Sequence, residues 1–167
     1  MNAVHWLQDL PLSTWIRESS WVMLVLVILH MLGMALMVGA GGLIAGRALG
    51  LARGVEPARF ACFVPVMRGG FALALFSGVL MLAAYPAKAL TNPVFYLKLG
   101  LLLGVVLLTR LLLLRFDKPG DDTYALPHGS RVVGIVILTM WVGVIACGQL
   151  LNHTYAMLLA FANAGSH

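Results

Sequence analysis

The chain has 167 residues, of which 61% are hydrophobic and 10% are charged, and its mean hydropathy is +0.96. A soluble globular domain carries about a quarter of its residues as charged types, so this composition excludes a soluble domain and predicts a protein embedded in a lipid bilayer. The apolar segments leave no room for a separate catalytic domain. The net charge is +5, but the basic residues lie between apolar segments, so we predict no nucleic-acid partner.

The N-terminal region precedes the first long apolar segment. It lacks a basic stretch followed by a short apolar one, so no cleavable signal peptide is predicted. Residues 2–17 mix tryptophan, leucine and isoleucine with Gln8, Asp9 and Arg17. This pattern is typical of a short helix that lies in the membrane interface, with Trp6 and Trp15 at the level of the lipid headgroups.

Four apolar segments can each cross a hydrocarbon core of about 30 Å, which needs about 20 residues in a helix. They cover residues 21–45, 64–85, 94–114 and 132–161. Pro86 cannot continue the second helix, and Pro93 suits the first turn of the third. The alternating pattern of a membrane β-barrel is absent. We therefore predict an all-α protein with one integral membrane domain over residues 1–167, an antiparallel transmembrane four-helix bundle behind the interfacial helix.

The basic residues predict the orientation of this bundle. The first and third connections carry Arg47, Arg53, Arg59, Arg110, Arg115, Lys118 and Arg131. The opposite side offers only Arg17 and Lys88. Because cytoplasmic loops are enriched in Lys and Arg, we predict a multi-pass protein of the bacterial inner membrane with both termini in the periplasm.

Four ionisable side chains inside the predicted spans qualify as candidates: His30, Arg68, Lys98 and His153. Such side chains are costly in a bilayer and are therefore candidate functional residues, although Arg68 is better explained as an anchor of its helix end. No Asp or Glu lies inside a span, which argues against a carboxylate proton relay and paired-carboxylate hydrolysis. Motifs for nucleophilic serine, phosphate-loop and zinc-hydrolase chemistry are absent as well. We therefore favour an electron-transfer or anchor subunit over an enzyme.

The two histidines predict a cofactor site. A neutral imidazole such as His30, near the middle of the first span, is a good ligand for haem iron. His153 falls in the same extracytoplasmic half of the bundle, so the pair is predicted to bind and ligate one haem b. Lys98 would neutralise a propionate or bind a quinone oxygen, with Gln149 and Tyr85 as hydrogen-bond partners. The structural alternatives are a core role for His30, an interfacial position for His153 and snorkelling of Lys98 to the membrane surface.

Other patterns in the spans have simpler explanations beside functional ones. Met31, Met34 and Met37 form with His30 a set of soft ligands that suits Cu(I) transport, but methionine is also an ordinary gap-filling residue. Small residues recur at helical spacing and predict close helix packing, or a flat cofactor against a glycine face; they are Ala35, Gly39, Gly42, Gly46 and Gly50, then Gly100 and Gly104. Cys62 and Cys147 match no metal or disulfide spacing and are predicted to be buried.

Four motifs, one for each predicted membrane helix, carry a resemblance that extends over nearly the whole chain: LHMLGMALMVG, RGGFALALFSGVLMLAAYP, NPVFYLKLGLLL and WVGVIACGQL. They resemble those of a family of small bacterial four-helix integral membrane proteins without an assigned activity, similar in layout to membrane b-type cytochromes and copper-resistance membrane domains. The resemblance implies the same four-helix fold and draws attention to His30 and Lys98, which fall within the motifs. In that family an arginine stands where this chain has Gln149.

The leading hypothesis is therefore a haem b-binding membrane subunit that transfers electrons between quinone and a periplasmic redox partner. One alternative is a cofactor-free membrane anchor or assembly subunit of a larger complex. The other is copper transport.

Overall fold

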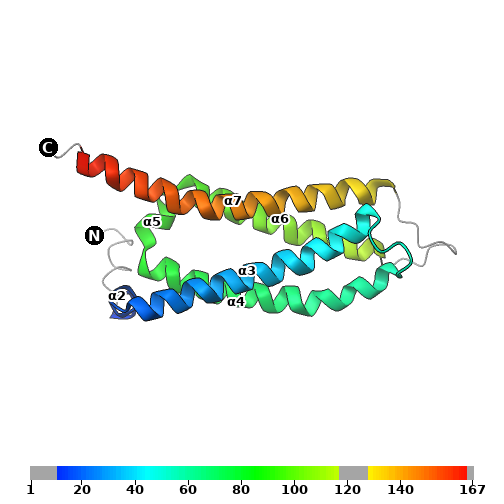
Figure 1. Ribbon diagram of the computed structural model, residues 1–167, viewed down its shortest axis with the longest axis horizontal. Helices are drawn as coiled ribbons and strands as arrows, with labels where there is room; N and C mark the ends of the chain where they lie inside the picture. Colours follow the sequence, from blue (N-terminus) through cyan, green and yellow to red (C-terminus); the bar gives the residue numbers. More distant parts are fainter. Residues whose placement is uncertain (1–10, 117–127, 165–167) are drawn as a thin grey trace.

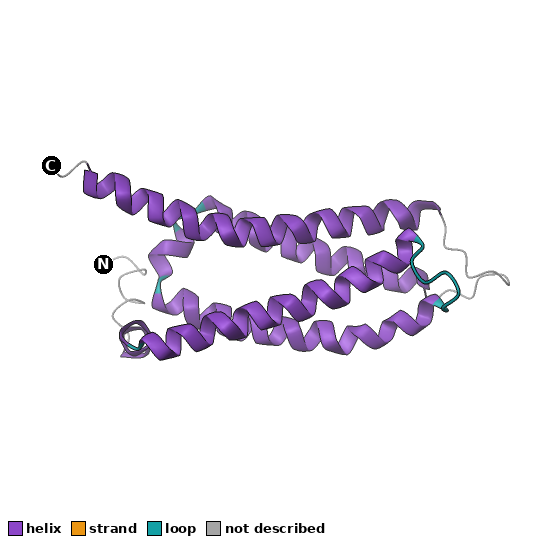
Figure 2. Ribbon diagram, in the orientation of Figure 1, coloured by secondary structure: helices purple, strands orange, loops and turns teal. Residues whose placement is uncertain are grey.

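The computed structural model describes residues 11–116 and 128–164, and its description of side chains ends at residue 151. Within those ranges all regular structure is helical (Figure 2). Four helices are long and apolar enough to cross a membrane. They are α3 (Ser20–Leu49), α4 (Val64–Ala84), α6 (Pro93–Phe116) and α7 (His128–Ala164). The all-helical class and the four apolar helices confirm that part of the prediction.

The four long helices lie lengthwise beside one another (Figure 1). Helix α3 packs against both α4 and α7, and α7 packs against α6. Among the described residues, α4 and α6 make no extensive contact with each other. The connection from α3 to α4, the end of α6 and the start of α7 lie at one end of the molecule, and the short helix α5 (Pro86–Leu90) joins α4 to α6 at the other (Figure 1).

The helix ends follow local sequence signals. Helix α3 ends at Leu49, four residues beyond the predicted end at residue 45. Gly50 follows it as the C-cap, with a φ of 100°, the left-handed conformation that glycine adopts readily. Helix α4 ends one residue earlier than predicted, before Tyr85. Helix α6 begins at Pro93, where the Asn92 side-chain oxygen accepts a hydrogen bond from the Val94 amide at 3.0 Å. This cap satisfies one of the free amides that every helix start presents.

Helix α2 (Pro11–Glu18) precedes α3 and rests against the ends of α3 and α4. The hydroxyl group of Ser13 donates a hydrogen bond of 2.8 Å to the carbonyl oxygen of Ala83. Ile16 is buried with Leu26 and Ala84 in a small apolar cluster. The other residues of the predicted N-terminal helix, 2–10, lie outside the described residues.

The connection between α3 and α4 folds back on α3. The Nε atom of Arg47 donates a hydrogen bond of 3.1 Å to the carbonyl oxygen of Val55. Arg47 is buried in the last turn of α3, whereas we predicted that it belongs to the connection. A 3-10 helix, η1 (Pro57–Phe63), then leads into α4. Cys62 is exposed in η1, so the prediction that both cysteines are buried is correct only for Cys147.

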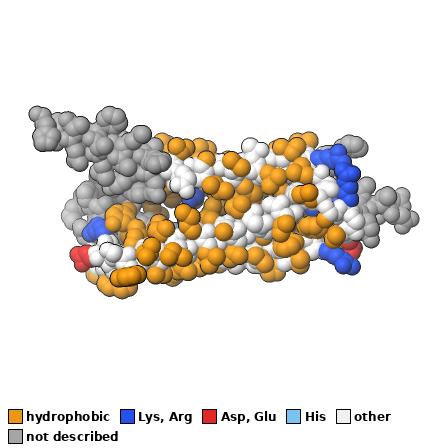
Figure 3. All heavy atoms as spheres, viewed as in Figure 1, with side chains coloured by type: hydrophobic (Ala, Val, Ile, Leu, Met, Phe, Trp, Pro, Cys, Tyr) orange, Lys and Arg blue, Asp and Glu red, His pale blue; other side chains and the backbone are white. Residues whose placement is uncertain are grey.

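The main core lies where α3 meets α7. Trp141 is buried there with Met37, Ile44 and Val144. Its indole ring lies over Gly41, because a Cβ atom on that glycine would stand 2.7 Å from the Trp141 Nε1 atom. The face of the molecule in Figure 3 is largely hydrophobic over the described residues, and Lys and Arg side chains gather at the end where α3 meets η1. An apolar surface of this extent is typical of a protein that contacts lipid.

Candidate functional site

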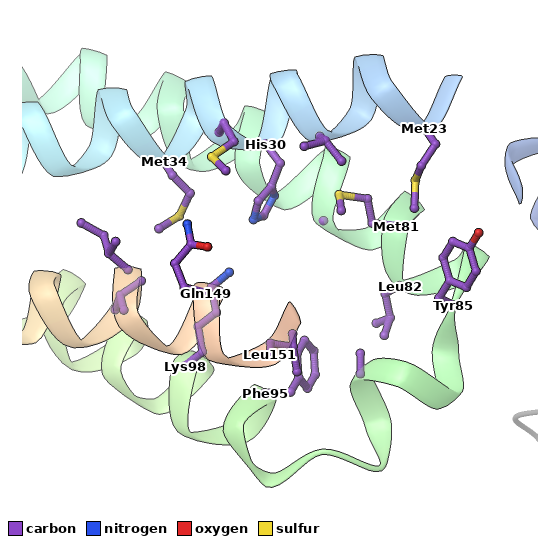
Figure 4. Close-up of a pocket in the computed structure, with 17 residues that line it drawn as sticks. Met23, His30, Met34, Met81, Leu82, Tyr85, Phe95, Lys98, Gln149 and Leu151 are labelled. Carbon is purple, nitrogen blue, oxygen red and sulfur yellow. The ribbon is translucent and has the colours of Figure 1, made fainter. Parts of the chain in front are cut away.

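A pocket of about 350 Å³ lies between the helices in the half of the bundle nearest α5. Side chains from α3, α4, α5, α6 and α7 line it (Figure 4). Most of them are apolar, and the polar groups are those of His30, Tyr85, Lys98 and Gln149. A mostly apolar cavity of about 300 to 1,000 Å³ with a few converging polar groups is the usual form of a small-molecule or cofactor site.

His30 enters the pocket from α3 with its ring orientation fixed by α4. Its Nδ1 atom lies 2.9 Å from the Ala74 carbonyl oxygen and 3.3 Å from the Ser77 hydroxyl oxygen. A carbonyl oxygen only accepts hydrogen bonds, so Nδ1 carries the proton and donates it. The neutral ring therefore keeps its free electron pair on Nε2. Figure 4 shows the ring extending from α3 into the pocket.

The hydroxyl group of Ser77 is placed to accept a hydrogen bond from His30. It is fully buried, and its hydroxyl group donates a hydrogen bond of 2.7 Å to the carbonyl oxygen of Leu73, on its own helix. The hydroxyl oxygen can therefore accept a share of the Nδ1 proton of His30. The carbonyl oxygen of Ala74 and the hydroxyl oxygen of Ser77 thus hold one side of the imidazole ring in place.

Gly78 gives the imidazole room. A Cβ atom on this glycine would stand 3.1 Å from Cε1 and 3.3 Å from Nδ1 of His30. These separations are tighter than ordinary van der Waals contact, so any side chain at position 78 would press on the ring. Gly78 was not among the predicted site residues, because no local pattern distinguishes it from the other glycines of the chain.

Lys98 and Gln149 occupy the wall opposite His30. Their side chains come from α6 and α7 and point into the same space as the histidine ring (Figure 4). The Lys98 Nζ atom is close to α7, since a Cβ atom on Gly148 would lie 3.8 Å from it. Within the described ranges the carboxylate side chains are those of Glu18 and Glu56, and neither lines the pocket. The ammonium group thus faces the pocket without a carboxylate neighbour from the described residues.

The methionines of the pocket differ from the predicted set. Met31 and Met34 line it as expected, but Met37 is fully buried in the core between α3 and α7. Met23 of α3 and Met81 of α4 join the lining instead. The helical spacing placed Met37 near the face of His30, but this position packs into the core, with Ile44 and Trp141 in the same buried cluster.

The structure does not place two other predicted residues in the pocket. Arg68 is exposed near the start of α4 and does not line it. His153 lies in α7, four residues after Gln149 and therefore near the same helix face, but its side chain lies outside the described residues. The pairing of His30 with His153 stays a prediction. In the described part of the chain, no group of three or more His, Cys, Asp or Glu side chains could hold a metal ion.

No protein-family model, curated protein or solved structure matches this chain. A function for this protein is therefore inferred from the geometry of the pocket.

Proposed function

We propose that this chain is a membrane subunit that binds haem b, which His30 would hold through its iron, and that it passes electrons between a quinone and a periplasmic redox partner. The observation that supports it best is the 2.9 Å hydrogen bond from His30 Nδ1 to the Ala74 carbonyl. Histidines that bind metals commonly donate their second nitrogen to a carbonyl or carboxylate, which fixes the ring and makes the ligating nitrogen more basic. His30 has this arrangement, with Nε2 available to the pocket.

The other residues of the pocket fit the same group. Apolar side chains such as Val27, Leu82 and Phe95 suit a large aromatic macrocycle, and Gly78 keeps space beside the ligand. Lys98 supplies a positive charge for a propionate. Haem iron held by histidine supplies one-electron reduction and oxidation at a potential that the axial ligands and the polarity of the site determine. On α7, Gln149 lies in the pocket and His153 is the proposed opposite ligand.

The position of the pocket supports transfer to the periplasmic side. We propose that the four helices form an antiparallel bundle in the inner membrane, with both termini in the periplasm and α2 in the membrane interface. His30 is ten residues into α3, which places it about 15 Å from the start of that helix at 1.5 Å per residue. A cofactor at His30 would lie in the periplasmic half of the bilayer. Quinone, which dissolves in lipid, would reach it from within the membrane.

A visible spectrum of the purified protein tests this function. Protein from haem-replete cells should show a Soret band and a dithionite-induced α band, and a pyridine haemochrome assay should identify haem b. The His30→Ala variant should lose both bands, and added imidazole should restore them because it can occupy the vacated ligand position. A colourless wild-type protein, or a His30→Ala variant with unchanged bands, would contradict the proposal.

A second candidate function, Cu(I) transport, has its own supporting observation. The thioethers of Met23, Met31, Met34 and Met81 share the pocket with His30, and soft sulfur ligands with an imidazole suit Cu(I). Metal analysis separates the two functions, because copper without haem in the wild-type protein would favour transport. Loss of copper in Met34→Leu and Met81→Leu would assign it to this pocket. Purified protein that contains neither haem nor copper would favour the role of a cofactor-free anchor or assembly subunit.

A further inference from the structure

A second groove lies at the opposite end of the bundle from the His30 pocket. It has a volume of about 310 Å³ and lies between η1, the start of α4 and the end of α6. Its lining consists of Ala58, Ala61, Val64, Arg110, Leu113, Leu114 and Phe116. All of these side chains except Arg110 are apolar.

The groove exists because α4 and α6 do not pack extensively against each other. Helix η1 contacts α3, α4 and α6 and so bridges the space at this end. The groove reaches the surface of the bundle, since Leu114 is 58% exposed. In a membrane that surface faces lipid, and a lipid chain is the component of the bilayer that can fill an apolar groove without losing hydrogen bonds.

Arg110 provides a charge at this apolar surface. Among the described residues the one ion pair is between Arg59 and Glu56, at 3.8 Å. The guanidinium group of Arg110 therefore has no carboxylate partner in the described part of the chain. A guanidinium group binds phosphate through two parallel hydrogen bonds, and the long arginine stem allows the charge to reach the headgroup region.

We propose that this groove binds an anionic phospholipid, with an acyl chain along the apolar walls and its phosphate on Arg110. The position fits, because Arg110 lies six residues before the end of α6, about 9 Å along the helix, and its long side chain can extend from there to the headgroup region. Hydrated inorganic phosphate would gain nothing from walls of alanine, valine, leucine and phenylalanine. The proposed site shares no lining residue with the His30 pocket, so it does not depend on the function of that pocket.

Native mass spectrometry of the detergent-purified full chain tests the site. Phosphatidylglycerol and phosphatidylcholine with the same acyl chains are added separately, and the bound fraction of each is measured. The wild-type protein should retain phosphatidylglycerol in preference to phosphatidylcholine. Arg110→Gln should retain about tenfold less phosphatidylglycerol, the size expected for loss of a hydrogen bond to a charged group. Arg131→Gln removes an exposed arginine outside the groove and should retain the wild-type amount.

A second variant tests the apolar part of the groove. Ala61→Trp places a large side chain in the groove and should lower the retention of phosphatidylglycerol while Arg110 remains. An excess of inorganic phosphate should leave the bound lipid in place, whereas competition by phosphate would assign the site to the free anion and overturn the proposal. Equal retention by the wild-type, Arg110→Gln and Arg131→Gln proteins, or equal retention of the two lipids by the wild-type protein, would overturn it as well.

Discussion

Gly33 of α3 and Gly70 of α4 face each other at a point where the two backbones touch. A Cβ atom on Gly33 would stand 2.8 Å from the Gly70 carbonyl oxygen, and a Cβ atom on Gly70 would stand 2.8 Å from the Gly33 carbonyl oxygen. His30 lies three residues before Gly33, and Ala74 lies four residues after Gly70. The close approach of the glycines therefore brings the His30 ring within hydrogen-bond distance of the Ala74 carbonyl.

Replacement of Gly33 by alanine should separate α3 from α4 and destabilise the protein. The new methyl group would also stand 2.6 Å from the Ala74 amide nitrogen, and overpacking of this kind costs about 1 to 3 kcal/mol. The midpoint of thermal unfolding in detergent should fall for Gly33→Ala. Gly39→Ala is a matched control on the same helix, because a Cβ atom at position 39 meets nothing within 4 Å. Equal midpoints for the two variants would argue against the close contact.

Replacement of Gly78 by valine should weaken cofactor binding more than it weakens the fold. Its side chain would press on the imidazole ring of His30, which a Cβ atom alone would approach to 3.1 Å. The ratio of Soret absorbance to protein should fall, with a smaller change in the unfolding midpoint. Gly69→Val on the same helix has open space around its Cβ position and should keep the wild-type ratio. Cofactor loss of the same extent in both variants would show that the effect is not specific to His30.

Replacement of Lys98 by methionine should change stability and binding in opposite directions. A lysine disfavours insertion of a membrane helix by about 2.5 to 3.5 kcal/mol at the helix centre and by less toward the ends, and Lys98 lies five residues after the start of α6. Methionine has a similar length without the charge. We expect the cofactor-free Lys98→Met protein to resist unfolding at least as well as the wild type, but to bind haem more weakly. Lys98→Arg keeps the charge and should retain most of the binding. If Lys98→Met lowers stability and leaves binding intact, Lys98 has a structural role.

The proposed orientation can be measured at the loop between α3 and α4. In a variant with Cys62→Ala and Cys147→Ala, a single cysteine introduced as Gly54→Cys lies at an exposed position. A membrane-impermeant maleimide should label this cysteine only after the inner membrane is broken, because the arginine-rich end is proposed to face the cytoplasm. Labelling in intact spheroplasts would reverse the orientation and place the His30 pocket in the cytoplasmic half.

The close helix contacts show where a local pattern misleads. Gly39 and Gly100 belong to regularly spaced small residues, yet a Cβ atom on either would meet nothing within 4 Å. The tightest contact between α3 and α4 instead involves Gly33 and Gly70, which are not among those regularly spaced small residues. Spacing identifies a face of one helix on which a neighbour can approach, but not whether a neighbour lies there.

The candidate site was predictable only in part. His30, Lys98, Gln149 and Tyr85 stood out because polar groups are rare in apolar spans, and the structure brings all four to one pocket. The carbonyl of Ala74 could not be identified in the same way. Every residue carries such a carbonyl, and helix geometry alone does not show which one a side chain on another helix will reach.

The sequence by itself determined the four apolar helices and, to within a few residues, their ends. The apolar segments are helical because a backbone in lipid must satisfy its own hydrogen bonds. The helix ends are predictable because proline, asparagine and glycine start or stop a helix through effects within one turn. Only the tertiary structure decided that the Nδ1 proton of His30 goes to Ala74, that Met37 joins the core and that Lys98 faces His30. These relationships depend on the rotation and crossing of helices far apart in the chain, which the packing of all four sets together.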